Sequence, residues 1–361
     1  MAGHLSATAP EDALRLAWVD VAKGICILLV VMMHSTLGTG EAMGGEGFLH
    51  TVVTFAKPFR IPDFFLLSGL FVGRVIDRDW RLFADRRVVH FAYFYGLWVI
   101  IQSLAKYPAI VGDAGPGAFA AHLLHALVEP YSTLWFIYLL AVFSVVTKLL
   151  RRVPAAVLLA GAALLQVVPV ATSSYLAEEF CARYVYFVAG YLFAGRIFAL
   201  AGWVARNPAP AVAALGLWAG IETWLAFTPA SLPGYPTLAS LPLLSLILGG
   251  AGALAIVAAA SLATRAGGPM TAALRTCGSR SIVIYLAFFL PMAATRTLIV
   301  KTGLIADIGL ASLIVMAVAV IVPLAFERAI RGTALGFLFV RPKAFHIVGA
   351  RPARNAALQP A

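Results

Sequence analysis

Charged residues are scarce in this sequence, and their scarcity excludes an ordinary water-soluble fold. Asp, Glu, Lys and Arg make up 12% of the 361 residues, whereas 61% are hydrophobic and the mean hydropathy is +0.91. Long apolar runs recur from one end of the chain to the other. A chain of this composition has lipid as the solvent for most of its surface. We therefore expect an all-α integral membrane protein embedded in a lipid bilayer.

Cysteine is also scarce. The three cysteines, Cys26, Cys181 and Cys277, each lie within or beside an apolar run. An odd number without a pairing pattern argues against a disulfide framework and gives no metal-ligand spacing. The net charge is +11, but no basic cluster is interleaved with exposed aromatic residues. In a membrane protein such an excess usually reflects basic cytoplasmic loops. We expect neither a bound metal nor a nucleic-acid partner.

The apolar runs predict ten membrane-spanning helices. The first run is too long for a signal peptide and lacks a small-x-small cleavage site, so we interpret it as a retained helix. No segment between the runs is long enough to form a second domain. The expected helices cover residues 17–37, 52–75, 88–107, 132–149, 154–170, 182–201, 209–228, 238–262, 279–298 and 308–328.

Arginine and lysine alternate from one connection to the next. Five arginines lie in residues 74–90, and the other even-numbered connections and the C-terminal tail are also basic. The odd-numbered connections are acidic or nearly neutral, so the positive-inside rule predicts that both termini are cytoplasmic. The expected organisation is a cytoplasmic N-terminal segment (1–14), a membrane domain (15–330) and a loose, basic cytoplasmic tail (331–361).

Polar side chains fall inside the expected spans, where each charged group costs roughly 2.5–3.5 kcal/mol at the helix centre. Five of these side chains also have a structural explanation. Asp20 and Lys23 can form a neutralising ion pair, and His34 can be hydrogen-bonded between two helices. Asp63 can stabilise a helix N-terminus, and Arg183 can lie at the membrane interface. Glu222 has no basic residue near it in the sequence, so it requires a partner or a water-filled cavity. The six groups are Asp20, Lys23, His34, Asp63, Arg183 and Glu222.

The run DVAKGICILLVVMMH places Lys23 and His34 eleven residues apart. In a helix this spacing puts both side chains on one face, about 16 Å apart along the axis. Asp63 and His34 come near the outer ends of consecutive antiparallel spans, at similar expected depth. A carboxylate beside an imidazole fixes its tautomer and raises its basicity, which suits a general base. We therefore predict a catalytic His34 that Asp63 orients.

Five runs resemble, in order, the signatures of the membrane-bound acyltransferase family 3, and the likeness covers residues from about 15 to 330. The family's first-helix motif is an arginine, ten residues and an essential histidine. His34 matches the histidine, and Lys23 takes the arginine position, as in relatives of glucan-succinylating proteins. Of two family arginines after the second helix, Arg87 is present and His90 replaces the other. Phe288 stands where many relatives have histidine. The runs are DVAKGICILLVVMMH (20–34), FRIPDFFLLSGLF (59–71), LWFIYLL (134–140), RYVYFVAGYLF (183–193) and LRTCGSRSIVIYLAFFLP (274–291).

The resemblance implies a membrane O-acyltransferase that moves an acyl group from cytoplasmic acyl-CoA to a hydroxyl of an extracytoplasmic acceptor. It implies acetyl-CoA as the donor substrate, with succinyl as the alternative acyl group, and a glycan or glycolipid of the cell envelope as the acceptor. Lys23, Arg86 and Arg87 are then the expected contacts to the CoA phosphates. The implied location is the inner (cytoplasmic) membrane, which the chain crosses several times.

Two other functions are compatible with the same residues. A transporter or flippase would use Lys23, His34, Asp63 and Glu222 to relay protons or to contact a substrate. A structural membrane subunit would keep the fold without chemistry. Within the acyltransferase interpretation, His34 can act as a general base or as a nucleophile that carries the acyl group. The sequence predicts no particular oligomeric state.

Overall fold

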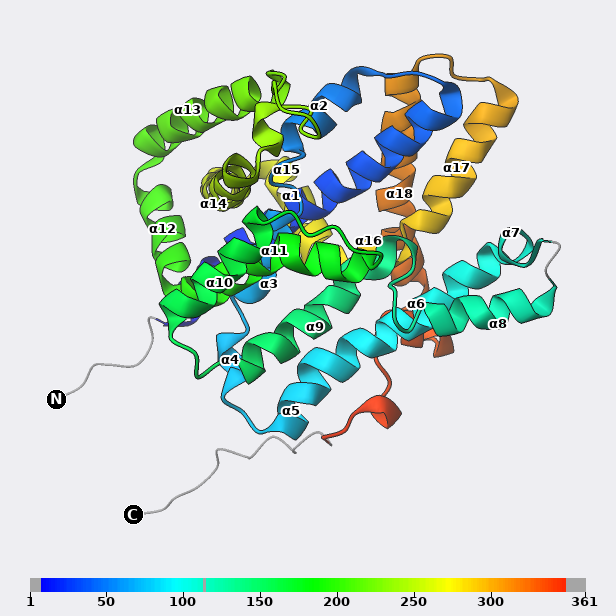
Figure 1. Cartoon of the computed structure of the whole chain (residues 1–361), viewed down its shortest axis with the longest axis horizontal. Coiled ribbons are helices and arrows are strands. Elements are labelled where there is room, and N and C mark those ends of the chain that lie inside the picture. Colours follow the sequence, from blue (N-terminus) through cyan, green and yellow to red (C-terminus); the bar gives the residue numbers. More distant parts are fainter. Residues whose placement is uncertain (1–7, 113–114, 349–361) are drawn as a thin grey trace.

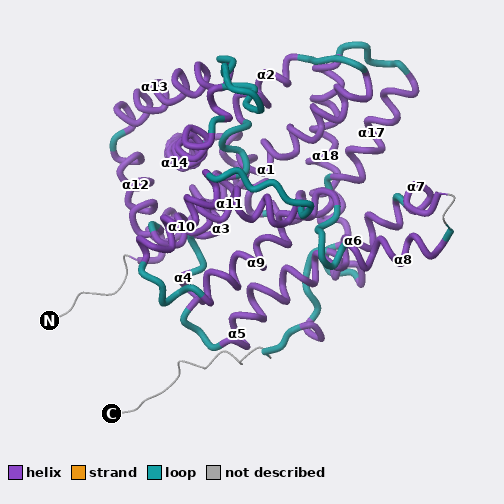
Figure 2. The backbone as a smooth tube through the Cα atoms, viewed as in Figure 1, coloured by secondary structure: helices purple, strands orange, loops and turns teal. Residues whose placement is uncertain are grey.

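We describe a computed structural model that covers residues 8–112 and 115–348. Within these residues the structure is helical, with one isolated β-bridge between Pro229 and Thr237. The long helix α1 (Thr8–Met43) runs through the bundle and packs against α14, α15 and α18, whereas α7 and α8 project at one side (Figures 1 and 2).

The other elements follow in chain order. The first half contains α2 (Phe48–Ala56), α3 (Pro62–Gly69), α4 (Gly73–Ile76), α5 (Trp80–Ala84), the π-helix η1 (Asp85–Val89), α6 (His90–Ala105), α7 (Tyr107–Val111), α8 (Pro116–His125), η3 (Ser132–Leu134), α9 (Trp135–Leu149) and α10 (Ala155–Val167). The second half contains α11 (Tyr175–Leu192), α12 (Ala194–Arg206), α13 (Pro208–Phe227), η4 (Leu238–Ser240), α14 (Pro242–Ala266), α15 (Gly268–Ser279), α16 (Ser281–Ala287), α17 (Phe289–Thr302), α18 (Ile308–Ile330), η5 (Ala334–Leu338) and η6 (Lys343–Phe345).

The membrane-spanning helices number fewer than the sequence predicts. In the part of the chain that the structure describes, six helices are long and apolar enough to cross a membrane, and eight spans result if two bent pairs are each counted as one. The pairs are α11 with α12, bent by 74°, and α16 with α17, bent by 51°. Ten continuous spans are therefore not confirmed. The side of the membrane on which the termini lie stays a prediction from loop charge.

Two of the expected spans account for the difference. The run 154–170 forms only the 13-residue α10, and the run 52–75 forms the short helices α2, α3 and α4. Pro58 and Pro62 lack an amide hydrogen and fix φ, which disfavours one continuous helix through this run. Pro62 instead takes the first turn of α3, where its missing amide has no intrahelical partner to lose. The break sets the start of α3 and thereby which of its side chains face α1.

A close backbone contact fixes α3 against α11. A Cβ added to Gly69 would lie 2.2 Å from the Phe187 carbonyl oxygen, and one added to Gly190 would lie 2.1 Å from the Leu66 carbonyl oxygen. Each helix therefore presents a glycine to the backbone of the other, as expected for small residues at a membrane helix interface. Around this contact lie Phe65, Leu66 and Phe187, which are almost fully buried.

Residues 334–348 pack against the bundle, whereas the sequence predicted a loose tail there. Arg341 donates to the Asp85 carbonyl oxygen at 2.7 Å and to its carboxylate at 3.1 Å. The Ile347 amide donates to the other carboxylate oxygen at 2.8 Å. A buried ion pair thus holds residues 334–348 against η1. At the other end α1 begins at Thr8, so part of the expected N-terminal segment is helical; residues 1–7 and 349–361 lie outside the described residues.

Candidate active site

His34 faces a cavity of about 190 Å³ bounded by α1, the start of α3, the start of α9, α11 and the bend between α16 and α17. The imidazole lies against the ring of Phe288, with 5.5 Å between the ring centroids. Phe288 is fully buried at that bend, so it forms a rigid wall beside His34. The remaining lining residues are Val30, Met33, Arg60, Ile61, Phe64, Thr133, Trp135, Phe136, Tyr175, Glu179, Arg183 and Tyr285.

Three charged side chains line the same cavity. Glu179 and Arg183, one turn apart in α11, form an ion pair at 3.0 Å. Arg60 donates from one terminal nitrogen to the Val53 carbonyl oxygen at 3.3 Å, and its Nε is buried without a hydrogen-bond partner. Buried donors are normally satisfied, so this N–H is a candidate contact for a bound substrate.

Sequence reasoning did not select Arg60. The residue falls inside the expected span 52–75 and within the run FRIPDFF, and a cation within a span was the signal that would have found it. The sequence analysis named Arg183 only as one of six polar side chains inside the expected spans. Its interfacial explanation omitted Glu179, which lies in the same helix and pairs with it.

Asp63 does not line the His34 cavity. Its side chain is fully buried near the Cys26 thiol of α1, and neither of its carboxyl oxygens has a hydrogen-bond partner. Asp63 and Phe64 are consecutive in the first turn of α3, so their side chains point about 100° apart. It is Phe64 that faces the cavity. The structure thus corrects the expected contact: Asp63 and His34 are not hydrogen-bonded to one another.

Lys23 and Arg87 meet in a second cavity of about 210 Å³. Lys23 Nζ lies 5.4 Å from the centroid of the Phe71 ring, and an Arg87 terminal nitrogen donates to the Phe71 carbonyl oxygen at 2.8 Å. The two predicted cations therefore share one site, although they are 64 positions apart in the sequence (23 and 87). The other lining residues are Phe64, Leu67, Ser68, Phe91, Phe136, Ile137, Leu140, Ser281, Ile282 and Tyr285.

The π-helix η1 separates Arg87 from its neighbour. Arg86 is exposed and lines neither cavity, whereas Arg87 is half-buried and faces the second one. A π-helical turn is wider than an α-helical turn and shifts the register of the side chains, and such turns are frequent at functional sites. Glu222 also lies outside both cavities. It is fully buried in α13, with neither carboxyl oxygen hydrogen-bonded.

The two cavities follow one another along the same helices. Phe64 of α3, Phe136 of α9 and Tyr285 of α16 line both. Phe64, Phe136 and Tyr285 thus mark the boundary between the two cavities. On each helix, residues on one side of this boundary line the His34 cavity, and residues on the other side line the Lys23–Arg87 cavity. The pairs of residues are Ile61 and Leu67 on α3 and the turn before it, Trp135 and Leu140 on α9, Phe288 and Ser281 on α16 and its bend, and His34 and Lys23 on α1.

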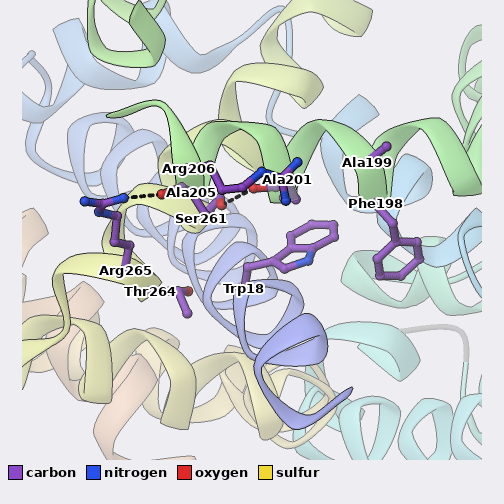
Figure 3. Close-up of a pocket in the computed structure, with 10 residues that line it drawn as sticks. Trp18, Phe198, Ala199, Ala201, Ala205, Arg206, Ser261, Thr264 and Arg265 are labelled. Atoms are coloured by element: carbon purple, nitrogen blue, oxygen red, sulfur yellow. Dashed lines mark hydrogen bonds between the residues drawn. The ribbon is translucent and has the colours of Figure 1, made fainter. Parts of the chain in front are cut away.

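A larger cavity, of about 650 Å³, opens elsewhere between α12, α14 and α1 (Figure 3). Trp18 forms one wall, Ser261 donates to the Ala201 carbonyl oxygen at 2.6 Å, and Arg265 donates to the Ala205 carbonyl oxygen. None of the residues that the sequence predicted for catalysis or donor binding lines this cavity. Within residues 8–112 and 115–348 no cluster of three His, Cys, Asp or Glu side chains suits a metal ion.

Two comparisons with known proteins gave a match. The inner membrane protein YcfT of Escherichia coli K12 is 28% identical over 156 residues, which are 37% of this chain and 44% of that protein. The chain therefore matches less than half the length of this relative. No solved structure matches the chain. A family model described as an acyltransferase domain matches residues 16–328, and the chain therefore belongs to the membrane-bound acyltransferase family 3.

Proposed function

We propose that this protein transfers an acyl group from acyl-CoA to a hydroxyl of a carbohydrate or related acceptor. The observation that carries the proposal is the succession of two cavities along α1, α3, α9 and α16. One holds Lys23 and Arg87, and the other holds His34. An anionic donor and a hydroxyl acceptor need different surroundings, and these two neighbouring cavities would supply both. The family membership supports acyl transfer as the chemistry.

The Lys23–Arg87 cavity suits the donor. Phosphate groups are bound by charge-assisted hydrogen bonds from lysine and arginine. Arg87 uses one terminal nitrogen on the Phe71 carbonyl oxygen, which fixes the guanidinium and leaves its other N–H groups for a ligand. Arg87 lies in the basic connection 74–90, which the loop charges assign to the cytoplasm. We therefore propose cytoplasmic acyl-CoA as the donor substrate, with acetyl as the acyl group and succinyl as the alternative.

The His34 cavity suits the acceptor and the reaction. Its walls combine aromatic faces from Trp135 and Tyr175 with the charged groups of Glu179 and Arg183. Small-molecule sites typically have such mostly apolar walls and a few convergent polar groups. We propose a hydroxyl of an envelope glycan or glycolipid as the acceptor, which reaches His34 from the outer face of the inner membrane.

In the proposed step, His34 acts as the general base. It takes the proton of the acceptor hydroxyl while the hydroxyl oxygen forms a bond to the thioester carbonyl carbon. The carbon–sulfur bond then breaks, the CoA sulfur leaves as a thiolate, and this thiolate takes the proton from the imidazolium. The products are an ester and free CoA, and His34 returns to its neutral form. Arg60 contributes an N–H that stabilises the negative charge on the carbonyl oxygen.

The test is the variant His34→Gln, which keeps a hydrogen-bonding side chain but removes the base. Thiol release from acetyl-CoA by the purified protein, and ester content of surface glycans in cells, are measured with protein level controlled. General-base help is worth roughly 10²–10⁴-fold, so we expect a loss of that size. His125→Gln is the matched control, because His125 is exposed on α8 and lines neither cavity. Near-normal esterification by His34→Gln would refute the proposal.

The donor site has a test of its own in two adjacent arginines. Arg87→Ala removes a guanidinium from the Lys23 cavity, whereas Arg86→Ala removes an exposed one that lines no part of it. Binding of acyl-CoA to the purified variants is measured by calorimetry. We expect weaker binding for Arg87→Ala and unchanged binding for Arg86→Ala. Equal affinities would remove Arg87 from the donor site.

A further inference from the structure

Three aromatic side chains separate the two cavities. Phe64, Phe136 and Tyr285 come from three different helices and line both cavities at the same level. The Phe64 and Phe136 rings lie edge to face with centroids 4.8 Å apart, and Phe136 and Tyr285 do so at 5.6 Å. The three rings form a continuous layer, which we call the aromatic layer. The aromatic layer therefore lies between the cavity of Lys23 and Arg87 and the cavity of His34.

Tyr285 is the fixed member of the aromatic layer. Its hydroxyl donates to the Thr133 carbonyl oxygen at 2.6 Å and accepts from the Ile137 amide at 3.3 Å. Its side chain is buried. The preceding residue of this turn, Ser132, has φ +53°, a region that residues other than glycine seldom adopt. The Tyr285 hydroxyl is thus held between the backbone of this turn, at Thr133, and the first turn of α9, at Ile137.

Phe136 is held by packing, and Phe64 is the least restrained of the three. The Phe136 ring also lies 4.6 Å from Phe65 and 6.4 Å from Trp135, centroid to centroid. Phe64 and Phe136 are both partly buried between the two main hydrophobic clusters, but among the described residues Phe64 contacts one aromatic ring and Phe136 contacts four. A rotation of the Phe64 side chain therefore breaks fewer aromatic contacts than a rotation of Phe136, and it breaks no side-chain hydrogen bonds like those that hold Tyr285.

We propose that Phe64 determines which acyl groups reach His34. Its ring closes the aromatic layer against the fixed Tyr285 and Phe136, and it turns aside to admit a short acyl thioester from the Lys23–Arg87 cavity. The closed layer excludes longer acyl groups and keeps the two cavities apart between turnovers. This inference rests on the proposed function for the identity of the passing group, but the barrier itself does not depend on it.

The first experiment measures acyl-chain preference. Thiol release by purified protein is followed with acetyl-CoA and butyryl-CoA for the wild type, Phe64→Ala and Phe64→Trp. One methylene in an apolar pocket changes discrimination by about 10–200-fold. We therefore expect Phe64→Ala to raise the ratio of butyryl to acetyl transfer by at least about tenfold, and Phe64→Trp to lower it. Phe227→Ala is the matched control, because Phe227 is exposed on α13 and lines neither cavity, so its loss should leave the ratio unchanged.

The second experiment measures the barrier without acyl chemistry. In a variant without the native cysteines, Met33→Cys introduces a thiol into the His34 cavity and Ser281→Cys introduces one into the other cavity. A membrane-impermeant thiol reagent is added to the side of the membrane on which Arg87 lies. We expect Ser281→Cys to react readily, and Met33→Cys to react only when Phe64→Ala is also present.

The two experiments separate the inference from the proposed function. In one outcome, Met33→Cys is labelled only when Phe64→Ala is present, but the wild type does not cleave acyl-CoA. That outcome would support the aromatic layer as a barrier and refute acyl-CoA as the donor. Cleavage that depends on His34, with acyl preference and Met33→Cys labelling both unchanged by Phe64→Ala, would support the donor and overturn the inference. If Phe64→Ala fails to fold, Phe64→Trp still tests the inference, because it removes no side-chain volume. An unchanged ratio of butyryl to acetyl transfer in Phe64→Trp would then overturn the inference.

Discussion

Replacing Arg341 with alanine is expected to release the C-terminal segment and to weaken donor binding. Arg341 and Asp85 form a buried ion pair, with side chains only 6% and 7% exposed. The same carboxylate accepts the Ile347 amide at 2.8 Å. Asp85 opens the π-helix η1, and Arg87 lies two residues further on. The ion pair therefore links the position of the C-terminal segment to the residue that we assign to the donor.

The size of the effect follows from the burial of the pair. Removing one partner of a buried ion pair leaves an uncompensated charge, which costs about 3–5 kcal/mol. Since about 1.4 kcal/mol corresponds to a factor of ten, local opening of residues 334–348 should rise by roughly a hundredfold to a few thousandfold. Replacing both Arg341 and Asp85 with alanine should restore part of the loss, because no buried charge is then left alone.

Hydrogen exchange at the Ile347 amide reports this opening directly, since that amide is bonded to Asp85. Acyl-CoA binding to the same samples reports the effect on Arg87. The matched control is Arg331→Ala, which breaks an ion pair with Glu327 at 3.0 Å in which the arginine is 55% exposed. Exposed pairs contribute about 0–1 kcal/mol, so this control should change little. Equal exchange rates in Arg341→Ala and wild type would refute the reasoning.

Three further predictions follow from the fold and the site. Gly190→Ala should destabilise the protein by about 1–3 kcal/mol or more, because the added Cβ would meet the Leu66 carbonyl oxygen. Gly216→Ala is the control and should not destabilise it, because the space around Gly216 is open. Detergent-resistance assays compare the two variants. Arg60→Ala should slow thiol release while Arg60→Lys keeps part of the rate, and equal rates in all three proteins would remove Arg60 from the reaction. Single cysteines at positions 44 and 80 should label from outside and inside the cell, respectively, and labelling of position 80 in intact cells would reverse the orientation.

The relative positions of Lys23 and His34 could be predicted from the sequence because the helix that carries them is continuous. The eleven-residue spacing of Lys23 and His34 has a definite meaning in any α-helix, and α1 is unbroken over that range. The family signatures added Arg87. The prediction for Arg86 rested on neither helix spacing nor a family signature. Adjacent residues on a helix face different directions, and the π-helical turn decides which of the two arginines points inward.

Asp63 shows where helical reasoning from the sequence failed. Similar depth along two antiparallel helices does not determine which way each side chain points about its helix axis. That rotation depends on where α3 begins, and α3 begins at Pro62 because the run 52–75 is broken. Arg60 could have been selected as a cation within an expected span, but its place beside the His34 cavity follows from the irregular turn between α2 and α3.

Composition and the lengths of the apolar runs by themselves predicted a helical membrane protein, because lipid favours apolar side chains and offers the backbone no hydrogen-bond partner outside the helix. The tertiary structure decided the rest. Only packing against neighbouring helices turned Asp63 towards Cys26, brought Arg60 to the His34 cavity and assembled Phe64, Phe136 and Tyr285 from three separate helices into one layer. Such contacts join residues that are far apart in the chain, and no local pattern in the sequence specifies them.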